Sequence, residues 1–245
     1  MEYTGAEFFN DAAVLDTYMR HRYREDSPNN SMEGPVMMEL IGDVAGQRVL
    51  DLGCGDGRFG LELLGLGAVS YLGLEGSGRM VRLAEEHLAG GPGRVLLQRV
   101  EEWDYPPRAF DLVVSRLALH YVADLPTLCQ QVYRTLAPGG RFVFSVEHPV
   151  ITSCDRSWPA DTPRQEWTVD DYFLTGERVT NWLGSTVRKY HRTVEDHFAA
   201  LQRAGLVVTT LREGLPRREH FHDQQTFEQR RRIPLFLFLV GEKMQ

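Results

Sequence analysis

Short apolar runs alternate with segments of helical periodicity along most of the chain. The runs, which predict buried strands, cover residues 48–52, 71–74, 95–97, 110–114 and 141–146. Between them, apolar side chains recur at helical spacing, as in Phe59, Leu63 and Leu66. Because a crossover between parallel strands needs a covering helix, this alternation predicts an α/β fold with helices on both faces of a mostly parallel sheet.

The two ends of the chain depart from this alternation. Further helices are predicted at 6–24, 31–43 and from Thr193 to Gly205, a hairpin at 179–190 turning at Gly184-Ser185, and strands at 206–211 and 235–240. We therefore expect one domain over 1–245, made of a helical cap (1–45), a core (46–149), a lid insertion after the fifth strand (150–192), and a last helix with two closing strands (193–245).

Charge is concentrated near the start of the chain. The 245 residues are 42% hydrophobic and 25% charged, with a net charge of −7, as expected for a compact globular protein. Residues 1–60 hold 11 acidic and 5 basic side chains. An acidic chain without a basic block disfavours nucleic acid and anionic membranes as partners, because both need a cationic surface. We expect a small-molecule partner, and either a monomer or a homodimer.

The cysteines, the first residues and the apolar runs indicate where in the cell the protein acts. Cys54, Cys129 and Cys154 have no paired spacing, so neither a disulfide framework nor a metal site is predicted. The first residues lack the basic start and apolar stretch of a signal peptide, which favours a cytoplasmic location. The apolar run at 233–240 is about ten residues too short to span a membrane.

A glycine-rich turn after the first predicted strand carries the strongest chemical signal. Gly53, Gly55 and Gly57 allow a sharp turn from strand to helix and let a ligand approach the main chain. Glu75 ends the next predicted strand, where a carboxylate can accept the hydroxyl hydrogens of a ribose. The loop and the acid together predict a nucleoside-binding site.

The same loop also fits a dinucleotide fingerprint, Gly55-x-Gly57-x-x-Gly60. Asp51 argues against that alternative, because a carboxylate inside the turn would repel a pyrophosphate but suits a cationic amino group. A dehydrogenase would also need a substrate domain for which this chain has no length left. A nucleotide-dependent oxidoreductase therefore stays the less favoured interpretation.

Five motifs in order resemble the class I S-adenosylmethionine-dependent methyltransferases over about residues 45–148. They are Asp51-x-Gly53-x-Gly55-x-Gly57, Glu75, Val100-Glu101-Glu102-Trp103, Phe110–Ser115 followed by Leu117–Val122, and Leu136-x-Pro-Gly-Gly140. Arg99 departs from the pattern, since many members have Asp there. The resemblance implies a Rossmann-like, doubly wound, mostly parallel seven-stranded sheet.

The resemblance also implies S-adenosylmethionine as cofactor, S-adenosylhomocysteine as product, and no metal. The residues expected to bind the cofactor are Asp51, Gly53, Cys54, Gly55, Glu75, Gly76, Met80, Val100, Glu101, Glu102 and Ser115.

Outer parts of the chain resemble a bacterial small-molecule subgroup of these enzymes, the methyltransferase type 11-like proteins. The motifs that carry this are Asn30-x-x-Glu33-x-Pro35, Ser145-Val-Glu-His-Pro149, Asp170-Asp-Tyr172 and Lys189-Tyr-His-Arg-Thr193. The resemblance implies methyl transfer to N, O or C of a small molecule, in specialised metabolism. A cyclase or synthase that uses the same cofactor and releases methylthioadenosine is the alternative.

Candidate catalytic residues come from the ends of predicted strands. His148 and His191 have side chains suited to general base work near neutral pH. Arg116 either holds a substrate carboxylate or phenolate, or forms a salt bridge to the acidic N-terminal helices. His120, within an apolar run, is interpreted as a satisfied residue, either of the core or of the layer that supports the site from behind.

Residues expected to bind the substrate lie in the cap, at strand ends and in the lid insertion. They are Tyr18, His21, Arg116, His148, Tyr172 and Tyr190. The aromatic residues Trp158, Trp167, Tyr172 and Trp182 either stack on a planar substrate or form a small core of the insertion itself.

Overall fold

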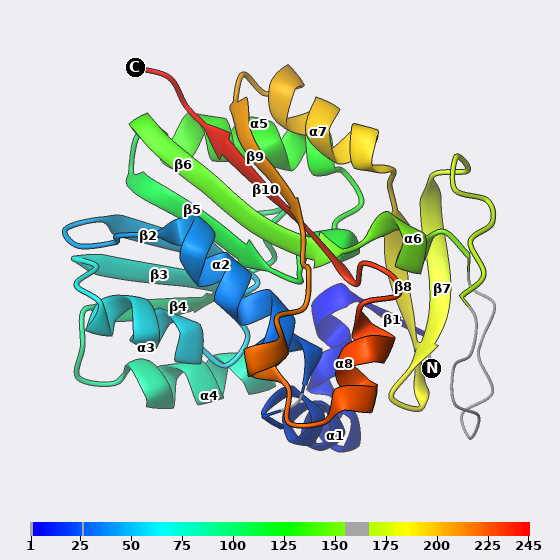
Figure 1. Ribbon diagram of the computed structural model, residues 1–245. Helices are drawn as coiled ribbons and strands as arrows, with labels where there is room; N and C mark the ends of the chain where they lie inside the picture. The colour runs from blue at the N-terminus through cyan, green and yellow to red at the C-terminus, as the bar shows by residue number, and fades with distance from the viewer. Residues whose placement is uncertain (1, 26, 155–166) are drawn as a thin grey trace.

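Seven strands form one sheet in the order β4-β3-β2-β5-β6-β10-β9 (Figure 1). The structure, a computed structural model, describes residues 2–25, 27–154 and 167–245. The strands are β2 (Arg48–Leu52), β3 (Ser70–Glu75), β4 (Gly93–Leu97), β5 (Phe110–Arg116), β6 (Leu136–Glu147), β9 (Val207–Glu213) and β10 (Phe236–Glu242). β10 runs antiparallel to both neighbours, and the pairings among β2 to β6 are all parallel. The predicted doubly wound, mostly parallel sheet is confirmed.

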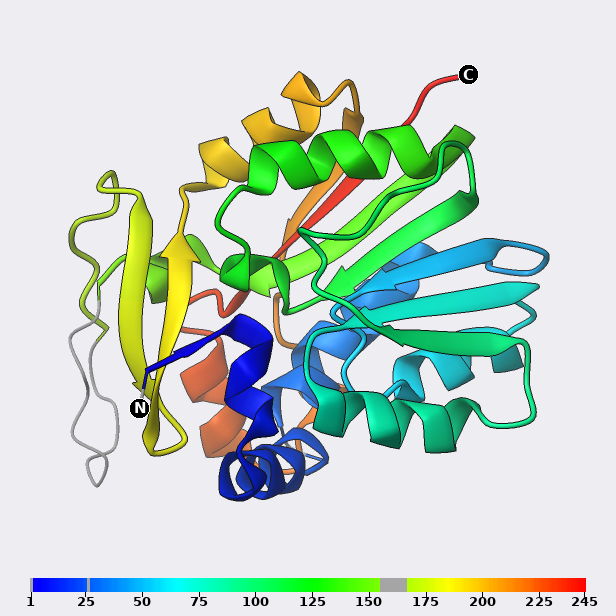
Figure 2. The ribbon, with the colours of Figure 1, turned by 180° about the vertical axis from the view of Figure 1, so that it is seen from behind.

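Helices cover both faces of this sheet. α2 (Gly34–Ile41), α3 (Arg58–Gly65) and α4 (Gly78–Leu88) contribute to the apolar cluster on one face. α5 (Leu125–Thr135) and α7 (Val194–Arg203) cover the other (Figures 1 and 2). Alternation along β6 explains the two clusters, since Phe142 and Phe144 pack with α5 and α7 while Val143 packs with α2.

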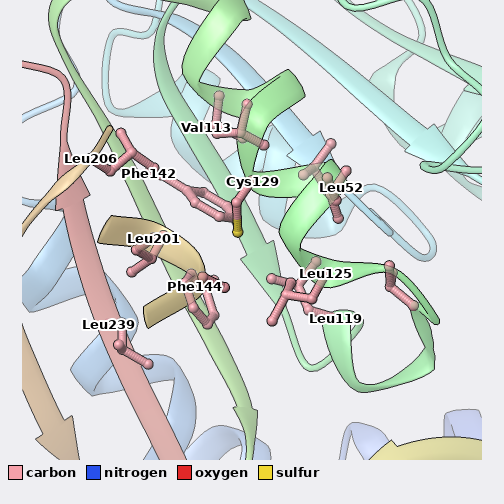
Figure 3. Close-up of a cluster of buried hydrophobic side chains, with 14 of the residues drawn as sticks. Leu52, Val113, Leu119, Leu125, Cys129, Phe142, Phe144, Leu201, Leu206 and Leu239 are labelled. Atoms are coloured by element: carbon pink, nitrogen blue, oxygen red, sulfur yellow. The ribbon is translucent and has the colours of Figure 1, made fainter. Parts of the chain in front are cut away.

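The cluster under α5 and α7 is drawn in Figure 3. Leu52, Val113 and Phe144 reach it from three adjacent strands, and Cys129 and Leu201 meet them from the two helices. All five side chains are fully buried. This core fixes the positions of β2, β5 and β6, whose carboxyl ends build the candidate site.

A small second sheet joins the N-terminus to the lid insertion. β7 (Gly176–Trp182) and β8 (Ser185–His191) form the predicted hairpin, and β1 (Glu2–Thr4) pairs with β8 in parallel. Figure 2 shows the N-terminal segment lying beside this hairpin. The turn is Leu183-Gly184 rather than the predicted Gly184-Ser185, because Ser185 pairs with Trp182. Leu183 and Gly184 both have positive φ, 50° and 81°, as a two-residue hairpin turn of type I′ requires.

The N-terminal cap is less regular than predicted. The helix expected at 6–24 is divided into η1 (Gly5–Asn10) and α1 (Ala12–Arg22) by Asp11, whose side chain caps α1. The helix expected at 31–43 begins as the π-helical turn η2 (Asn29–Glu33) and continues as α2. The remaining short helices are η3 (Leu119–Tyr121), α6 (Pro149–Thr152), η4 (Arg218–His220) and α8 (Gln224–Arg230). Among the described residues, every helix is too short or too polar to cross a membrane.

Candidate active site

A cavity of about 460 Å³ opens at the carboxyl edge of the parallel strands. Gly53 follows β2, Glu75 ends β3, Val100 follows β4, Arg116 ends β5 and Glu147 ends β6, and all five line it. The chain order reverses between β2 and β5, which is where doubly wound sheets bind their ligands. The cap and the hairpin close the cavity from outside.

The glycine loop has the shape that the sequence predicts. Gly53 has a φ of 76°, and a Cβ there would lie 2.5 Å from the Cβ of Ala118. Gly57 has a φ of 75°, and a Cβ there would lie 2.9 Å from the Cβ of Ala84 of α4. Gly60 makes room for the ring of Tyr71. The third glycine of the dinucleotide fingerprint is therefore explained by packing.

Asp51 lies beneath this loop with one oxygen unused. Its side chain is 2% exposed, and Oδ2 accepts a hydrogen bond of 2.7 Å from the Tyr71 hydroxyl. Oδ1 has no hydrogen-bond partner among the described residues. Burial raises the pKa of Asp51 to about 7. A smaller cavity of about 190 Å³ adjoins this carboxylate, so a cationic amino group placed there would satisfy the orphaned oxygen.

Glu75 is held by backbone N–H groups on both oxygens. Gly55 N donates to Oε2 at 2.9 Å and Ser77 N donates to Oε1 at 2.8 Å. Burial still raises the pKa of this carboxyl group above its ordinary value. Gly76 packs against Ala6 of the cap, since a Cβ there would lie 2.6 Å from the Ala6 methyl group. The carboxylate is therefore fixed at the cavity wall where a ribose would meet it.

Of the residues predicted to contact adenine in the loop after β4, some line the cavity and one does not. Val100 and Glu101 line the cavity, while the Glu102 side chain is 64% exposed and does not. Arg99 also lines the cavity. Its guanidinium nitrogens lie within 4.0 Å of carboxylate oxygens of Glu7, Glu101 and Glu102. An arginine at this position is thus tied to three carboxylates at the mouth of the site.

Three other predicted cofactor residues take different places. Met80 lines the cavity from α4. Cys54 lines the smaller cavity beside Asp51. Ser115 lines neither, because its hydroxyl donates to the Leu52 carbonyl at 2.8 Å and links β5 to β2.

Arg116 forms a buried ion pair with Glu33 of the cap. The guanidinium Nε lies 3.1 Å from both carboxylate oxygens, and Nη2 makes a closer contact with Oε2. Burial alone would raise the pKa of Glu33, but the charge and the hydrogen bonds of Arg116, together with Arg22 and the Ser145 hydroxyl, outweigh burial and lower the pKa. Of the two interpretations of Arg116, the salt bridge to the N-terminal helices is the one present.

The same network shapes the turn after β5. Ser145 donates its hydroxyl to Glu33 at 2.7 Å and accepts the Leu117 N–H at its own Oγ and carbonyl oxygens. Leu117 has a φ of 52°, which costs energy for a branched side chain and is maintained by these bonds. The turn delivers η3, with His120, to the cavity wall.

His120 is not the satisfied residue, of the core or of the layer behind the site, that the sequence predicts. It is 3% exposed and lines the cavity, yet its Nδ1 has no hydrogen-bond partner among the described residues. Burial lowers the pKa of this histidine to about 4, so its ring is neutral at physiological pH.

Glu147 and Lys189 stand beside it. Lys189 Nζ lies 2.6 and 2.8 Å from the two carboxylate oxygens of Glu147. Burial alone would raise the pKa of Glu147, but the charge and hydrogen bonds of Lys189, with a further contribution from His120, lower it overall. Both residues belong to motifs quoted above, but neither was predicted to be part of the site. The chain has only two lysines, at 189 and 243, among its 27 basic residues, and a lysine inside a predicted strand was the available signal.

Aromatic side chains from the cap and the hairpin form the outer wall. Phe9, Tyr18 and Trp182 line the cavity, with the Tyr18 ring centroid 4.8 Å from Phe9 and 5.8 Å from Trp182. Trp167 also lines it and donates from Nε1 to the Val150 carbonyl at 3.1 Å. Trp158 lies outside the described residues. The cap and the lid insertion thus build one wall together.

The other predicted substrate and catalytic residues lie outside the cavity. His148 caps α6 by accepting the Val150 N–H, and its Nε2 lies 3.0 Å from Glu213. His191 contacts the Thr152 hydroxyl at Nδ1 and the Tyr172 carbonyl at Nε2. These contacts give both histidines structural roles.

Tyr172, Tyr190 and His21 also face elsewhere. The Tyr172 hydroxyl accepts the Val194 N–H at the start of α7. Tyr190 lies on the face of β8 opposite Lys189, with the Arg192 guanidinium 5.8 Å from its ring centroid. His21 is exposed on α1.

The comparisons with known proteins agree with this geometry. Residues 49–140 match a family model described as a methyltransferase domain. A protein of Haemophilus influenzae with no assigned function is 29% identical over 94% of each chain. The comparison with solved structures finds a Listeria monocytogenes protein assigned as an S-adenosylmethionine-dependent methyltransferase, 33% identical, covering 87% of this chain and 97% of that one with a TM-score of 0.80. An S-adenosylmethionine-dependent methyltransferase of Mesorhizobium loti is also 33% identical, covering 86% and 97%, with a TM-score of 0.79.

The cofactor fits the residues at the site, since the free oxygen of Asp51 and the fixed carboxylate of Glu75 match its amino group and its ribose. Within the described part of the chain, no cluster of three or more His, Cys, Asp or Glu is arranged to bind a metal ion. The chain belongs to the class I S-adenosylmethionine-dependent methyltransferases.

Proposed function

We propose that this enzyme methylates a small molecule bound between Glu147, His120 and the aromatic wall. The observation that carries the proposal is one cavity with two chemically different ends. Gly53 and Glu75 line it at the ends of β2 and β3, and His120 and Glu147 line it after β5 and at the end of β6, on the other side of the sheet's switch point. A volume of about 460 Å³ is within the range of small-molecule sites, which supports an acceptor of modest size beside the cofactor.

Each end has a separate task in the proposed reaction. S-adenosylmethionine supplies a methyl group on a positively charged sulfur. Asp51 holds its amino group, Glu75 its ribose, and Val100 with Glu101 its adenine. The Glu33–Arg116 pair holds the turn after β5. The wall that His120 lines therefore stays at a fixed distance from the glycine loop. Positioning two reactants in this way is the main contribution a protein makes to an in-line displacement.

The aromatic wall excludes water from the reacting groups. Phe9, Tyr18 and Trp182 cover the cavity with ring faces and edges, and water exclusion strengthens every charge interaction inside. His120 and Glu147 offer the acceptor an unprotonated ring nitrogen and a carboxylate oxygen. These two groups, rather than His148 or His191, are the proposed contacts of the acceptor.

Calorimetry with S-adenosylhomocysteine tests the cofactor half. We expect binding by the wild-type protein and weak or undetectable binding by Asp51→Ala, with Glu213→Gln as a control outside the cavity. Mass spectrometry of turnover mixtures then separates the two reactions, since methyl transfer yields S-adenosylhomocysteine and a cyclase or synthase of the alternative kind yields methylthioadenosine. A folded protein that fails to bind S-adenosylhomocysteine at millimolar concentration would refute the proposal.

A further inference from the structure

Glu147 and His120 line the end of the cavity proposed for the methyl acceptor, here called the acceptor end. This end presents groups that accept hydrogen bonds without a matching donor. The Glu147 side chain is 24% exposed and lines the cavity, while Lys189 is 6% exposed and bonds both of its oxygens from behind. The Lys189 nitrogen lies 5.9 and 5.3 Å from the ring centroids of Tyr121 and Trp182, which enclose it. A ligand therefore meets the carboxylate and not the ammonium group.

His120 supplies the second acceptor. Its Nδ1 is buried without a partner among the described residues, and a neutral imidazole always has one nitrogen that accepts a hydrogen bond. Its ring lies 4.3 Å, centroid to centroid, from Tyr121, so the backbone of η3 and this contact fix its orientation. Two acceptors on adjacent walls match a ligand group that carries two donor hydrogens.

The charges of the cavity argue against an anionic acceptor. Among the described lining residues the permanent cations are Arg99 and Arg116, and both are paired with carboxylates of this chain. A carboxylate or phosphate on the acceptor would face Glu147 and find no unpaired cation within this described lining. A fully charged ammonium group is also poorly matched, because Lys189 already neutralises Glu147.

We propose that the methyl acceptor is an uncharged amine whose two N–H groups bind Glu147 and His120, with Lys189 orienting the carboxylate. This rests on the proposed function. The nitrogen lone pair forms the new N–CH₃ bond, and the electron pair of the broken C–S bond stays on sulfur, which becomes a neutral thioether. The nitrogen becomes positively charged next to Glu147, and it loses its proton to solvent after release. A hydroxyl group has one donor hydrogen and leaves one of the two acceptors unpaired.

Three probes of one ring size test the proposal at neutral pH. Aniline, phenol and benzoate are titrated into the protein saturated with S-adenosylhomocysteine. Aniline is an uncharged amine there, and we expect it to bind about tenfold tighter than phenol, with benzoate weakest, because phenol leaves one buried acceptor without a hydrogen bond. The same mixtures with S-adenosylmethionine should yield N-methylaniline by mass spectrometry.

Variants assign the preference to the pair. Glu147→Leu with Lys189→Met removes both charges and the acceptor oxygens, so no buried ion stays unpaired, and it should abolish the preference for aniline while S-adenosylhomocysteine still binds. Glu213→Gln, a carboxylate outside the cavity, should keep the preference. Equal binding of the three probes, tighter binding of phenol or benzoate, or no binding of any probe to the loaded protein would overturn the amine assignment. If the folded wild-type protein does not bind S-adenosylhomocysteine at all, that result would instead refute the proposed function.

Discussion

The two ends of the cavity are built in different ways. At the cofactor end, Asp51, Gly53 and Gly55 belong to one strand and the loop that follows it, and Glu75 is bonded to that loop by a backbone N–H. At the acceptor end, Glu147 comes from the main sheet and Lys189 from the hairpin, 42 residues later. A site made by one loop is fixed by local geometry, whereas a site made by two sheets depends on how those sheets are joined.

Polar contacts follow the same division. At the cofactor end, two backbone N–H groups hold Glu75. The Tyr71 hydroxyl holds one oxygen of Asp51, and the other oxygen is left free for the ligand. The acceptor end and the turn that leads to it depend on two side-chain ion pairs, Glu33–Arg116 and Glu147–Lys189. Disruption of a pair should therefore affect stability more than loss of a ligand contact does.

The largest expected effect is on the Glu33–Arg116 pair. Glu33→Gln leaves a buried guanidinium without its counter-ion, which should lower the free energy of unfolding by about 3–5 kcal/mol. Glu33→Gln combined with Arg116→Met should recover part of that loss, because no buried charge is then unpaired. Urea denaturation of the two variants measures both values. Equal stability of the single and double variants would show that the pair does not couple the cap to β5.

Asp51 should show the opposite balance between stability and binding. Its pKa is raised in the folded protein from an ordinary 3.8 to about 7, so the stability that it contributes is present below pH 3.8 and is lost as pH rises to about 7. Asp51→Asn has no charge to bury and should raise the melting temperature of the ligand-free protein at pH 8. The same variant should weaken S-adenosylhomocysteine binding by about 10–100-fold, as expected for a lost charged hydrogen bond. A melting temperature below that of the wild type would contradict the first expectation.

The same pKa predicts how cofactor affinity depends on pH. The ammonium group of the ligand binds the ionised form of Asp51, and protons compete for that form below about pH 7. The affinity for S-adenosylhomocysteine should therefore fall by up to about tenfold per pH unit below pH 7, with proton release on binding. Calorimetry in two buffers of different ionisation enthalpy measures that release. Asp51→Asn should flatten the pH dependence, and a flat curve for the wild type would show that another group pairs with the ligand.

These contrasts also explain what could be predicted from the sequence. The core strands, the glycine loop and Glu75 were predicted because their signals are local, a short apolar run or a fixed spacing along the chain. The pairing of β1 with β8 joins Glu2–Thr4 to Thr186–Arg188, and three residues carry no pattern that reveals it. His120 has apolar neighbours and was assigned to the core, but the left-handed turn at Leu117 directs it to the cavity.

The motifs that resemble the small-molecule subgroup have a structural explanation. Glu33 bonds Ser145, Glu147 bonds Lys189, and Tyr172 bonds both the start of α7 and, through its carbonyl, His191. Four segments that are distant in the sequence therefore hold the cap, the sheet and the hairpin together. Their residue types were visible in the chain, but no local rule connects one segment to another.

The smallest expected effect concerns His148. An asparagine at this position can still accept the Val150 N–H and cap α6, so His148→Asn loses only the contact of Nε2 with Glu213, whose side chain is 57% exposed. Exposed contacts of this kind contribute less than about 1 kcal/mol. We expect cofactor affinity and methyl transfer within about twofold of the wild type, whereas Glu147→Leu with Lys189→Met should lose the amine preference. A large fall in turnover for His148→Asn, at unchanged melting temperature and cofactor affinity, would contradict this expectation. It would show that His148 takes part in methyl transfer and that the methyl acceptor binds nearer to α6.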